Sequence, residues 1–345
     1  MTRRSSPGGV SRIAWLVFLT FVLVPGYLLM AQDANKNCLA EHYKVIALPL
    51  QPAHINQARQ VVGTTSSHRA ALWTEQSGLR EVPLPPGYFN SEGIAVNRSG
   101  HLTGVAYDRT FSHHQAFLFA NGAMTLLAGE QSRSYAINDS DEVVGESLLS
   151  GKKATEPVFW GKNSSGKNSS SKNMIQSLGG CCGGSARAVN NHAVAIGDLY
   201  DLDGRYHAFT WNSRQGLQTI GPSDRYSSAI AINNRGDILI QVLSDVFLYA
   251  GGKLISLELS TQAPSQPIAI NNCDVIVGSY GPFSDVARAF VWQKSSGFRD
   301  LNTLIAPNSG WKLESATSIN DRGEIVGRGD YQGNDDAGFL LIPDR

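Results

Sequence analysis

One alternation of apolar and polar positions recurs seven times along this chain. In each copy a short run of small and branched aliphatic residues ends at an asparagine, as in Ser134-Tyr-Ala-Ile-Asn138. The residue before the asparagine is always Ile or Val, and those two and four positions before it are nearly all small. The seven asparagines are Asn56, Asn97, Asn138, Asn190, Asn233, Asn271 and Asn320. Because successive side chains of a strand point to opposite faces, the pattern predicts a β-strand with one small face and one branched aliphatic face.

Three further strands are predicted after each asparagine. A polar turn such as Asn233-Asn-Arg-Gly236 leads into an apolar run that ends in glycine, as in Val143-Val-Gly145. Only the fifth copy departs, with Ile240 in place of that glycine. Glycine inside a strand predicts a bulge or the close approach of another backbone. The third run ends in a large ring in nearly every copy, as in Ala208-Phe-Thr-Trp211, and we expect these rings to pack between repeats. The fourth run is short, as in Leu217 to Ile220.

The spacing of the repeats predicts the architecture. The asparagines are 41, 41, 52, 43, 38 and 49 residues apart, which is typical of propeller blades or solenoid turns. The last copy has no fourth strand before Arg345, whereas a spare strand, Tyr43–Leu48, precedes the first copy. We therefore predict an all-β fold over residues 43–345, a seven-bladed β-propeller whose N-terminal strand closes the last blade. An open β-solenoid is the alternative fold.

The repeated unit resembles that of a known bacterial family. Its parts are Ala-Ile-Asn, Val-Val-Gly and His-Ala-Phe-x-Trp, the last of which stands at His207 to Trp211. In these parts the chain resembles the HAF family of extracellular repeat proteins over residues 43–342. The resemblance implies an exported bacterial protein with propeller-like repeats, and it carries no catalytic motif. The chain departs from the family pattern at Ile240 and in a polar, low-complexity insertion at residues 161–173.

The N-terminal residues are predicted to direct export. Three arginines precede an uncharged apolar run over residues 13–30, and Ala31 provides a small residue for cleavage before Gln32. Residues 1–31 therefore read as a signal peptide or, because the apolar run approaches the length of a membrane span, as a retained anchor. Residues 32–42 are predicted to be a linker. We expect an extracellular or periplasmic protein that contacts a membrane only through residues 13–30 if they are retained.

Composition narrows the classes of partner. The formal net charge is zero, so the chain lacks the basic surplus that nucleic-acid binding requires. Only 17% of the residues are charged and 35 are glycine, which suits short strands joined by tight turns. Because the net charge is zero, we expect no nucleic-acid partner.

Export would place the four cysteines where disulfides persist. In the propeller, the turn that holds Cys273 and the approach to the closing strand, where Cys38 stands, lie on one face of neighbouring blades. Cys181 and Cys182 precede an innermost strand on the opposite face, and a bridge between adjacent cysteines is strained. A Cys38–Cys273 disulfide is therefore a candidate, with free or differently paired thiols as the alternative.

The residue five positions before each repeat asparagine is polar in all seven copies. These residues, named the mouth ring here, are Gln51, Glu92, Arg133, Ser185, Ser228, Gln266 and Ser315. In the propeller they surround one mouth of the central channel, where they would contact a ligand. The alternative is that the entry to a strand is simply hydrated.

A second candidate site is a loop with three aspartates. Asp198, Asp201 and Asp203, followed by Gly204, resemble part of a calcium loop, because hard cations take several oxygen ligands from a tight turn. No glutamate follows at the closing position, so a solvated Asp-Gly turn is the alternative. We expect no cofactor.

The sequence favours binding over catalysis. It contains no Gly-x-Ser-x-Gly, His-Glu-x-x-His or phosphate-loop motif. We expect a monomeric binding or surface-interaction module for a surface glycan, peptide or protein. The alternative is a carbohydrate-active hydrolase or lyase with carboxylates at the channel mouth, for which Glu92, Asp108 and Asp201 are candidates.

Overall fold

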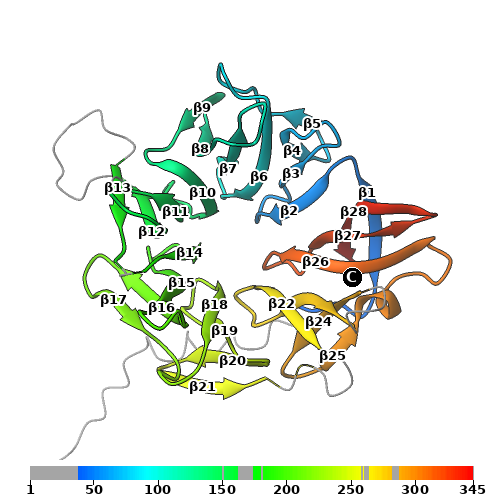
Figure 1. Ribbon diagram of the computed structural model, residues 1–345. Helices are drawn as coiled ribbons and strands as arrows, with labels where there is room; N and C mark the ends of the chain where they lie inside the picture. The colour runs from blue at the N-terminus through cyan, green and yellow to red at the C-terminus, as the bar shows by residue number, and fades with distance from the viewer. Residues whose placement is uncertain are drawn as a thin grey trace, which may run out of the picture. The chain divides into compact units, whose positions relative to one another are not determined.

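The chain folds into seven four-stranded antiparallel sheets arranged as blades around a central axis (Figure 1). The structure is a computed structural model that describes residues 38–149, 151–161, 174–179, 182–257, 259, 264–281 and 287–344, without the side chains of residues 174–176. The predicted export segment, all but Gly161 of the predicted insertion, and Cys181 lie outside these residues. No helix in the described part of the chain is long and apolar enough to cross a membrane. The predicted all-β propeller is confirmed.

The strands of blades one to seven are given from the channel outward. The innermost strands are β2 (Gln51–Ile55), β6 (Asn90–Val96), β10 (Glu130–Ile137), β14 (Gly184–Val189), β18 (Ser227–Ile232), β22 (Ser265–Ile270) and β26 (Trp311–Ile319). The second strands are β3 (Val61–Thr64), β7 (Leu102–Tyr107), β11 (Val143–Leu148), β15 (Ala195–Tyr200), β19 (Ile238–Val242), β23 (Ile276–Tyr280) and β27 (Ile325–Tyr331). The third strands are β4 (Ala70–Thr74), β8 (His114–Ala120), β12 (Thr155–Gly161), β16 (Tyr206–Asn212), β20 (Asp245–Ala250), β24 (Arg288–Gln293) and β28 (Asn334–Pro343). The outermost strands are β5 (Gly78–Glu81), β9 (Ala123–Leu126), β13 (Met174–Ser177), β17 (Gly216–Thr219), β21 (Lys253–Ser256), β25 (Gly297–Asp300) and β1 (Tyr43–Leu48).

The N-terminal strand closes the ring. β1 pairs antiparallel with β28 in an unbroken register from Tyr43 opposite Pro343 to Leu48 opposite Gly338. It is thereby the outermost strand of blade seven, whose other strands come from the C-terminal end of the chain. This closure is the predicted one, and it excludes the open solenoid.

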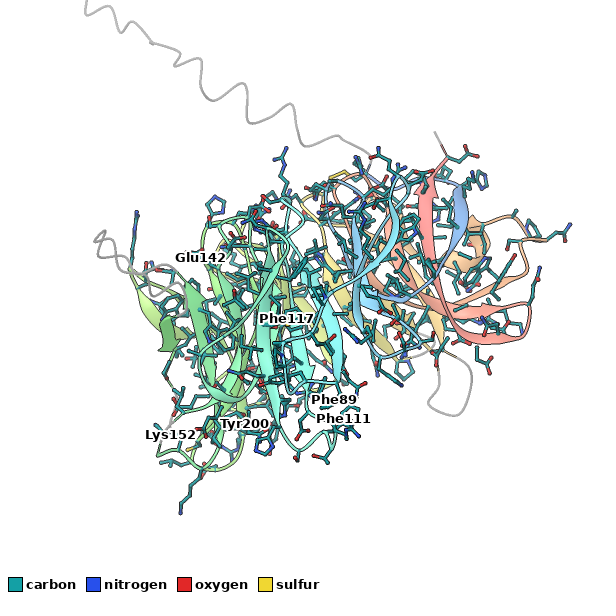
Figure 2. All side chains as sticks on the ribbon, turned by 90° about the horizontal axis from the view of Figure 1, so that it is seen from above. Phe89, Phe111, Phe117, Glu142, Lys152 and Tyr200 are labelled. Atoms are coloured by element: carbon teal, nitrogen blue, oxygen red, sulfur yellow. A yellow bond between two sulfur atoms is a disulfide. The ribbon has the colours of Figure 1, made fainter. Side chains whose placement is uncertain are left out.

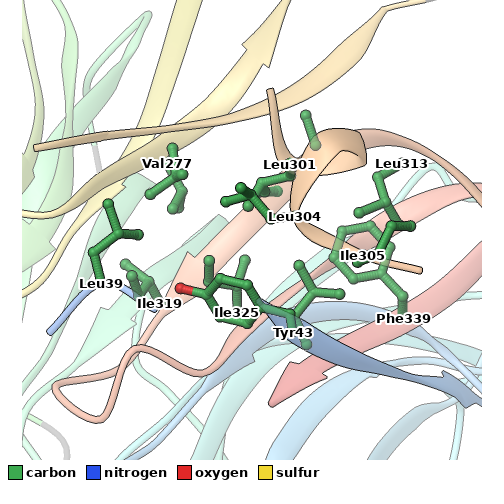
Figure 3. Packing of buried hydrophobic residues seen from close by; sticks show 14 of the residues in the cluster. Leu39, Tyr43, Val277, Leu301, Leu304, Ile305, Leu313, Ile319, Ile325 and Phe339 are labelled. Carbon is green, nitrogen blue, oxygen red and sulfur yellow. The ribbon is translucent and has the colours of Figure 1, made fainter. Parts of the chain in front are cut away.

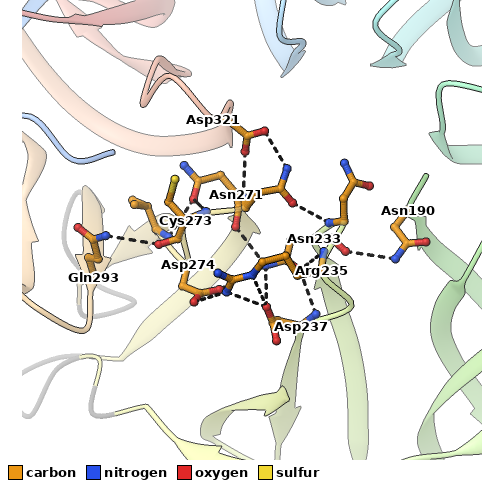
Figure 4. Close-up of polar contacts among 12 residues, drawn as sticks. Asn190, Asn233, Arg235, Asp237, Asn271, Cys273, Asp274, Gln293 and Asp321 are labelled. Carbon is orange, nitrogen blue, oxygen red and sulfur yellow. Dashed lines mark hydrogen bonds and ion pairs between the residues drawn. The ribbon is translucent and has the colours of Figure 1, made fainter. Parts of the chain in front are cut away.

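Each repeat asparagine ties its blade to the next one. Its Nδ2 donates a hydrogen bond of 2.7–3.2 Å to the backbone oxygen of the following repeat asparagine. The link from Asn320 Nδ2 to the Asn56 oxygen, at 3.0 Å, completes the circle. The Oδ1 atom accepts from the N–H groups two and four positions later, as Asn190 does from His192 and Val194. All seven asparagines are buried and together form a closed circle, the asparagine belt, part of which is drawn in Figure 4.

A bulge recurs in every innermost strand. The register with the second strand slips by one residue at the position three before each repeat asparagine. The bulged residues, named the bulge ring here, are Ala53, Ile94, Tyr135, Arg187, Ile230, Ile268 and Thr317. An extra residue on one strand re-aims the side chains on either side of it.

The second-strand glycines make room for this irregular backbone. A Cβ atom on Gly145 would lie 1.9 Å from the Arg133 carbonyl oxygen, and one on Gly197 would lie 1.9 Å from that of Ser185. Such contacts are impossible for any residue with a side chain, so the close backbone approach predicted from the glycines is confirmed. Ile240, which replaces this glycine in blade five, is fully buried.

Rings at the ends of the third strands pack between blades, as predicted. Trp211 of blade four lies 5.1 Å from Phe159 of blade three, measured between ring centroids. Trp160 of blade three packs in the cluster that contains Ala116 and Leu127 of blade two, and its Nε1 donates to the Ala128 oxygen at 2.8 Å. Each apolar cluster among the described residues joins two neighbouring blades in this way. The core is therefore divided into seven interfaces around the ring.

The largest of these clusters lies between blades six and seven (Figure 3). It contains Leu39 and Tyr43 from the N-terminal arm, and Leu301 and Leu304 from η1 (Leu301–Leu304), a 3-10 helix that follows β25. Leu39 is 5% exposed. Cys38 and Leu39, near the C-terminal end of the predicted linker, thus pack as part of the fold.

A disulfide fastens this arm. It joins Cys38, just before the closing strand, to Cys273 in the turn of blade six, with 6.2 Å between the Cα atoms. This is the pair that the predicted strand directions bring together. A Cβ atom on Gly323 would lie only 2.1 Å from the backbone oxygen of Cys38, so the arm runs directly over the turn of blade seven.

We expect the replacement Asn190→Ala to lower the free energy of unfolding by about 2–4 kcal/mol, because it leaves buried backbone groups of two blades without partners. Asn191→Ala is the matched control. Its side chain is exposed and bonds only at the surface, to Asp139, so we expect a loss below about 1 kcal/mol. Chemical denaturation of both variants measures the two losses. Equal losses would show that the belt has no special role.

We expect the double replacement Cys38→Ser and Cys273→Ser to lower the free energy of unfolding by about 2–4 kcal/mol, because the bridge constrains an unfolded loop of 235 residues. Reductant should destabilise the wild type by a similar amount and the double variant much less. Denaturation with and without reductant measures both effects. A double variant as stable as the oxidised wild type would refute the stabilising role.

Candidate functional site

The two faces of the propeller carry different chemistry. The asparagine belt and the turns after the innermost strands form one face, named the turn face. The opposite face, where the innermost strands begin, is named the mouth face. In Figure 2, which is turned by 90° from the view of Figure 1, Phe89, Phe111 and Tyr200 lie toward the mouth face and Glu142 lies toward the turn face.

A pocket of about 550 Å³ opens on the mouth face over blades three to six. It is lined by Tyr135, Arg187, Asp198, Tyr200, Tyr206, Ser228, Ile230, Gln241, Gln266, Pro267 and Ile268. Four of these, Tyr135, Arg187, Ile230 and Ile268, belong to the bulge ring, so bulged residues make up much of the lining. We refer to it as the mouth pocket.

The structure spreads the predicted mouth ring over several environments. Ser228 and Gln266 line the mouth pocket, whereas the other five members do not. Glu92 accepts a hydrogen bond from Tyr107 Oη at 3.0 Å, and the guanidinium of Arg133 lies 5.5 Å from the centre of the Tyr107 ring. The mouth pocket therefore takes in two of the seven members of the mouth ring.

The same carboxylate arrangement occurs in blades three and four. Asp198 of β15 accepts from Arg187 Nε at 2.5 Å within its blade and from Ser228 Oγ of blade five at 2.8 Å. Glu146 of β11 accepts from Tyr135 Oη at 3.0 Å and from Ser185 Oγ of blade four at 2.7 Å. In both cases a second-strand carboxylate joins a bulged residue of its own blade to a mouth-ring serine of the next blade.

Sequence reasoning missed Glu146 and the bulge ring, and it considered Asp198 only as a candidate member of a calcium loop. A signal was present, because Glu146 and Asp198 each directly follow a second-strand glycine. Their partners come from other strands, however, and the bulge that re-aims Tyr135 and Arg187 leaves no mark in residue type.

Tyr107, Tyr135 and Arg187 keep their ordinary charge states near neutral pH. Burial and the Glu146 carboxylate raise the pKa of the Tyr135 hydroxyl, and burial with Glu92 raises the pKa of Tyr107 to about 12. Burial works against the charge of Arg187, but its bond with Asp198 prevails and raises its pKa. These tyrosines are neutral donors and Arg187 stays a cation, which equips the site for hydrogen bonding.

Tyrosines form one rim of the mouth pocket. Tyr200 is 42% exposed and Tyr206 is 36% exposed, and their ring centroids are 6.3 Å apart in an edge-on arrangement. The Tyr206 ring also lies 5.0 Å from that of Tyr226, which is 40% exposed. Contacts between the rings fix their orientation, so they present a preformed aromatic surface to the solvent.

The loop carboxylates that the sequence singled out serve as caps of their loops. Although partial desolvation opposes it, hydrogen bonds from the His113, Ser112 and Thr110 groups lower the pKa of Asp108 to about 2. The bond from His207 and N–H groups of the same turn lower the pKa of Asp201. A general acid needs a raised pKa, so neither residue suits that role.

The predicted calcium loop does not form a metal site. Asp198 is paired with Arg187, Asp201 caps its own turn, and the exposed Asp203 lies 3.6 Å from Arg205. Within the described ranges, no group of three or more His, Cys, Asp or Glu side chains converges to hold a metal ion. Asp201 and Asp203 lie in a hydrogen-bonded turn, whereas Asp198 is buried within β15.

A smaller cavity of about 170 Å³ lies at the turn face, inside the asparagine belt. Branched aliphatic side chains that precede the asparagines line it, together with the residues that follow them and His54. His54 stands where the other repeats have alanine or serine, and its Nδ1 accepts from the Val96 N–H at 3.5 Å. Burial lowers the pKa of His54 to about 4.

We expect His54 to make stability depend on pH between about 4 and 6.5. Because its pKa is lower in the folded state, the unfolded chain binds more protons in this window, and stability falls as the pH is lowered through it. We expect a loss of about 1–2 kcal/mol, below the full value of the shift because His54 is partly exposed. Unfolding measured across this window should be less pH-dependent in His54→Ala, which restores the residue of the other repeats. Parallel pH profiles would contradict the assignment.

Comparisons with known proteins identify the fold. No protein-family model matches the chain, and no curated protein matches it. The β-propeller domain of the Trilobed protease from Pyrococcus furiosus is similar with a TM-score of 0.57 and 8% identity, over 88% of this chain and 96% of that one. A streptogramin B lyase is similar with a TM-score of 0.56 and 9% identity, over 88% and 98%. YCF48 bound to a D1 peptide is similar with a TM-score of 0.53 and 10% identity, over 88% and 95%. At these identities the likeness establishes a β-propeller, and the resemblance to the HAF family stays a prediction.

Proposed function

We propose that this protein is an exported binding module whose ligand site is the mouth pocket. The observation that carries this proposal is the pocket itself, about 550 Å³ lined by three tyrosines, two glutamines and the Arg187–Asp198 ion pair. A concave site with apolar walls and a few convergent polar groups is the usual form of a ligand site. A propeller fold is consistent with a binding or interaction role.

The distribution of variation between the faces supports binding at the mouth. All seven repeats keep the same asparagine on the turn face, with the same bond to the next blade. The bulge ring, in contrast, ranges from Ala53 through Ile230 and Tyr135 to Arg187. A uniform frame with a varied lining lets one arc of the channel differ chemically from the rest, which selectivity for a ligand requires.

The arrangement of the carboxylates favours binding over hydrolysis. Glu146 and Asp198 each accept hydrogen bonds from two fixed neighbours, and Asp198 is 4% exposed. A hydrolase needs one carboxyl group that delivers a proton and a second that meets the substrate or a water molecule. Carboxylates already engaged in this way serve better to hold Arg187, Tyr135 and the serines in place.

Export is supported by two features. The N-terminal residues have the charge and hydropathy pattern of a signal peptide. The Cys38–Cys273 disulfide suits an oxidising compartment. The mass of the protein recovered from the cell envelope or the medium reports whether the chain is cleaved after Ala31.

Arrays of immobilised glycans and peptides test the binding site. We expect the ligands retained by the wild-type protein to lose most of their signal with Gln266→Ala, which removes an exposed amide from the mouth pocket. Gln218→Ala, on the outermost strand of blade four, is the matched control and should bind normally. Binding that survives Gln266→Ala unchanged would place the site elsewhere.

Two additions sharpen this test. Gln51→Ala changes the mouth ring in blade one, outside the pocket, and should leave binding intact if the ligand occupies only the arc of blades three to six. Mass spectrometry of the bound ligands after incubation detects turnover. Product formation would favour the hydrolase or lyase alternative over the binding module.

A further inference from the structure

The lining of the mouth pocket indicates a class of ligand. We infer that it binds a neutral pyranose unit of an oligosaccharide, an inference that rests on the proposed function. The reasons are the charge balance of the pocket, its hydrogen-bonding groups and the position of its apolar side chains.

The first reason is that the pocket offers no uncompensated charge. Arg187 and Asp198 are its only charged lining residues, and they bond to each other. A charged ligand would find each of these groups already paired, and it would lose its own hydration without gaining a counter-ion. A neutral polar ligand avoids this cost.

The second reason is the mixture of donors and acceptors. The Arg187 side chain is 45% exposed while that of Asp198 is 5% exposed, so the guanidinium covers the carboxylate and offers its remaining N–H groups outward. Ser228, Gln241 and Gln266 add hydroxyl and amide groups along the same arc. Sugar hydroxyls both donate and accept, and two neighbouring hydroxyls match the fixed fork of a guanidinium.

The third reason is that apolar surface lies on both sides of these groups. Tyr200 and Tyr206 lie on the side of blade four, and Ile230, Pro267 and Ile268 lie on the side of blades five and six. The C–H faces of a pyranose ring are apolar and stack on tyrosine rings, while its hydroxyl edge bonds polar groups. A ring with apolar faces and a polar edge therefore matches the pocket on both counts.

The experiment is titration calorimetry of the full chain with neutral trisaccharides of glucose, galactose, mannose or N-acetylglucosamine. We expect at least one to bind at a single site, with an affinity that changes less than about twofold between ~0.05 and ~0.5 M NaCl, because no net charge is involved. Tyr206→Ala should weaken binding about tenfold or more, whereas Tyr206→Phe, which keeps the ring, should weaken it less than about threefold.

The outcomes separate this inference from the proposed function. Binding of peptides alone, still dependent on Gln266, would overturn the saccharide and leave the binding module standing. Exclusive binding of acidic saccharides, or a steep loss of affinity with salt, would overturn the neutral ligand. Saccharide binding that Gln266→Ala and Tyr206→Ala leave unchanged would overturn both, since the site would lie elsewhere. Failure of every trisaccharide to bind would overturn the inference.

Discussion

The hydrogen bond from each repeat asparagine to the next blade is the interaction on which the ring depends. Asparagine suits this position because its amide has a donor and an acceptor on one short side chain. The oxygen holds the turn of its own blade, and the nitrogen reaches the neighbouring backbone. Aspartate lacks the donor, and serine would not span the gap. Because the seven links close on themselves at Asn320 and Asn56, they fix the distance between all blades at the turn face.

This fixed face leaves the opposite face free to vary. Between belt and mouth, every innermost strand bulges by one residue, and in six blades a second-strand glycine makes room for the neighbouring carbonyl. The bulged side chain is released from pairing with the second strand, so its identity is not constrained by the sheet. Tyr135, Arg187, Ile230 and Ile268 occupy this position along the mouth pocket. The bulge thus allows the side chains that line the channel to differ between blades, although the strands themselves repeat.

Much of the fold could be predicted from the sequence, because strands and blades have a strong period. The closing strand Tyr43–Leu48 was predicted to the residue, and the role of the rings between blades followed from their size. The glycines predicted a bulge or a close backbone approach, but which residue of the innermost strand bulges could not be predicted, since an unpaired residue can be of any type, from Ala53 to Arg187. The site was therefore only partly foreseen. Ser228 and Gln266 lie at the strand starts and were included, whereas Glu146 joins Tyr135 and Ser185 of two different blades, and no local spacing encodes that contact.

Blade five departs from the repeat at a position beside the mouth pocket. Ile240 stands where six other blades have glycine, and it pairs with Ala229 in the register that those glycines use. In the glycine blades, the mouth-ring carbonyl lies about 2 Å from the site of a Cβ atom, closer than any atom could approach. The Ser228 carbonyl of blade five must therefore lie elsewhere, because Ile240 carries a full side chain packed between Ile238 and Val242 in a buried cluster. Ser228 is also the residue that donates to Asp198. This departure from the repeat therefore falls beside Asp198, the one carboxylate among the lining residues of the mouth pocket.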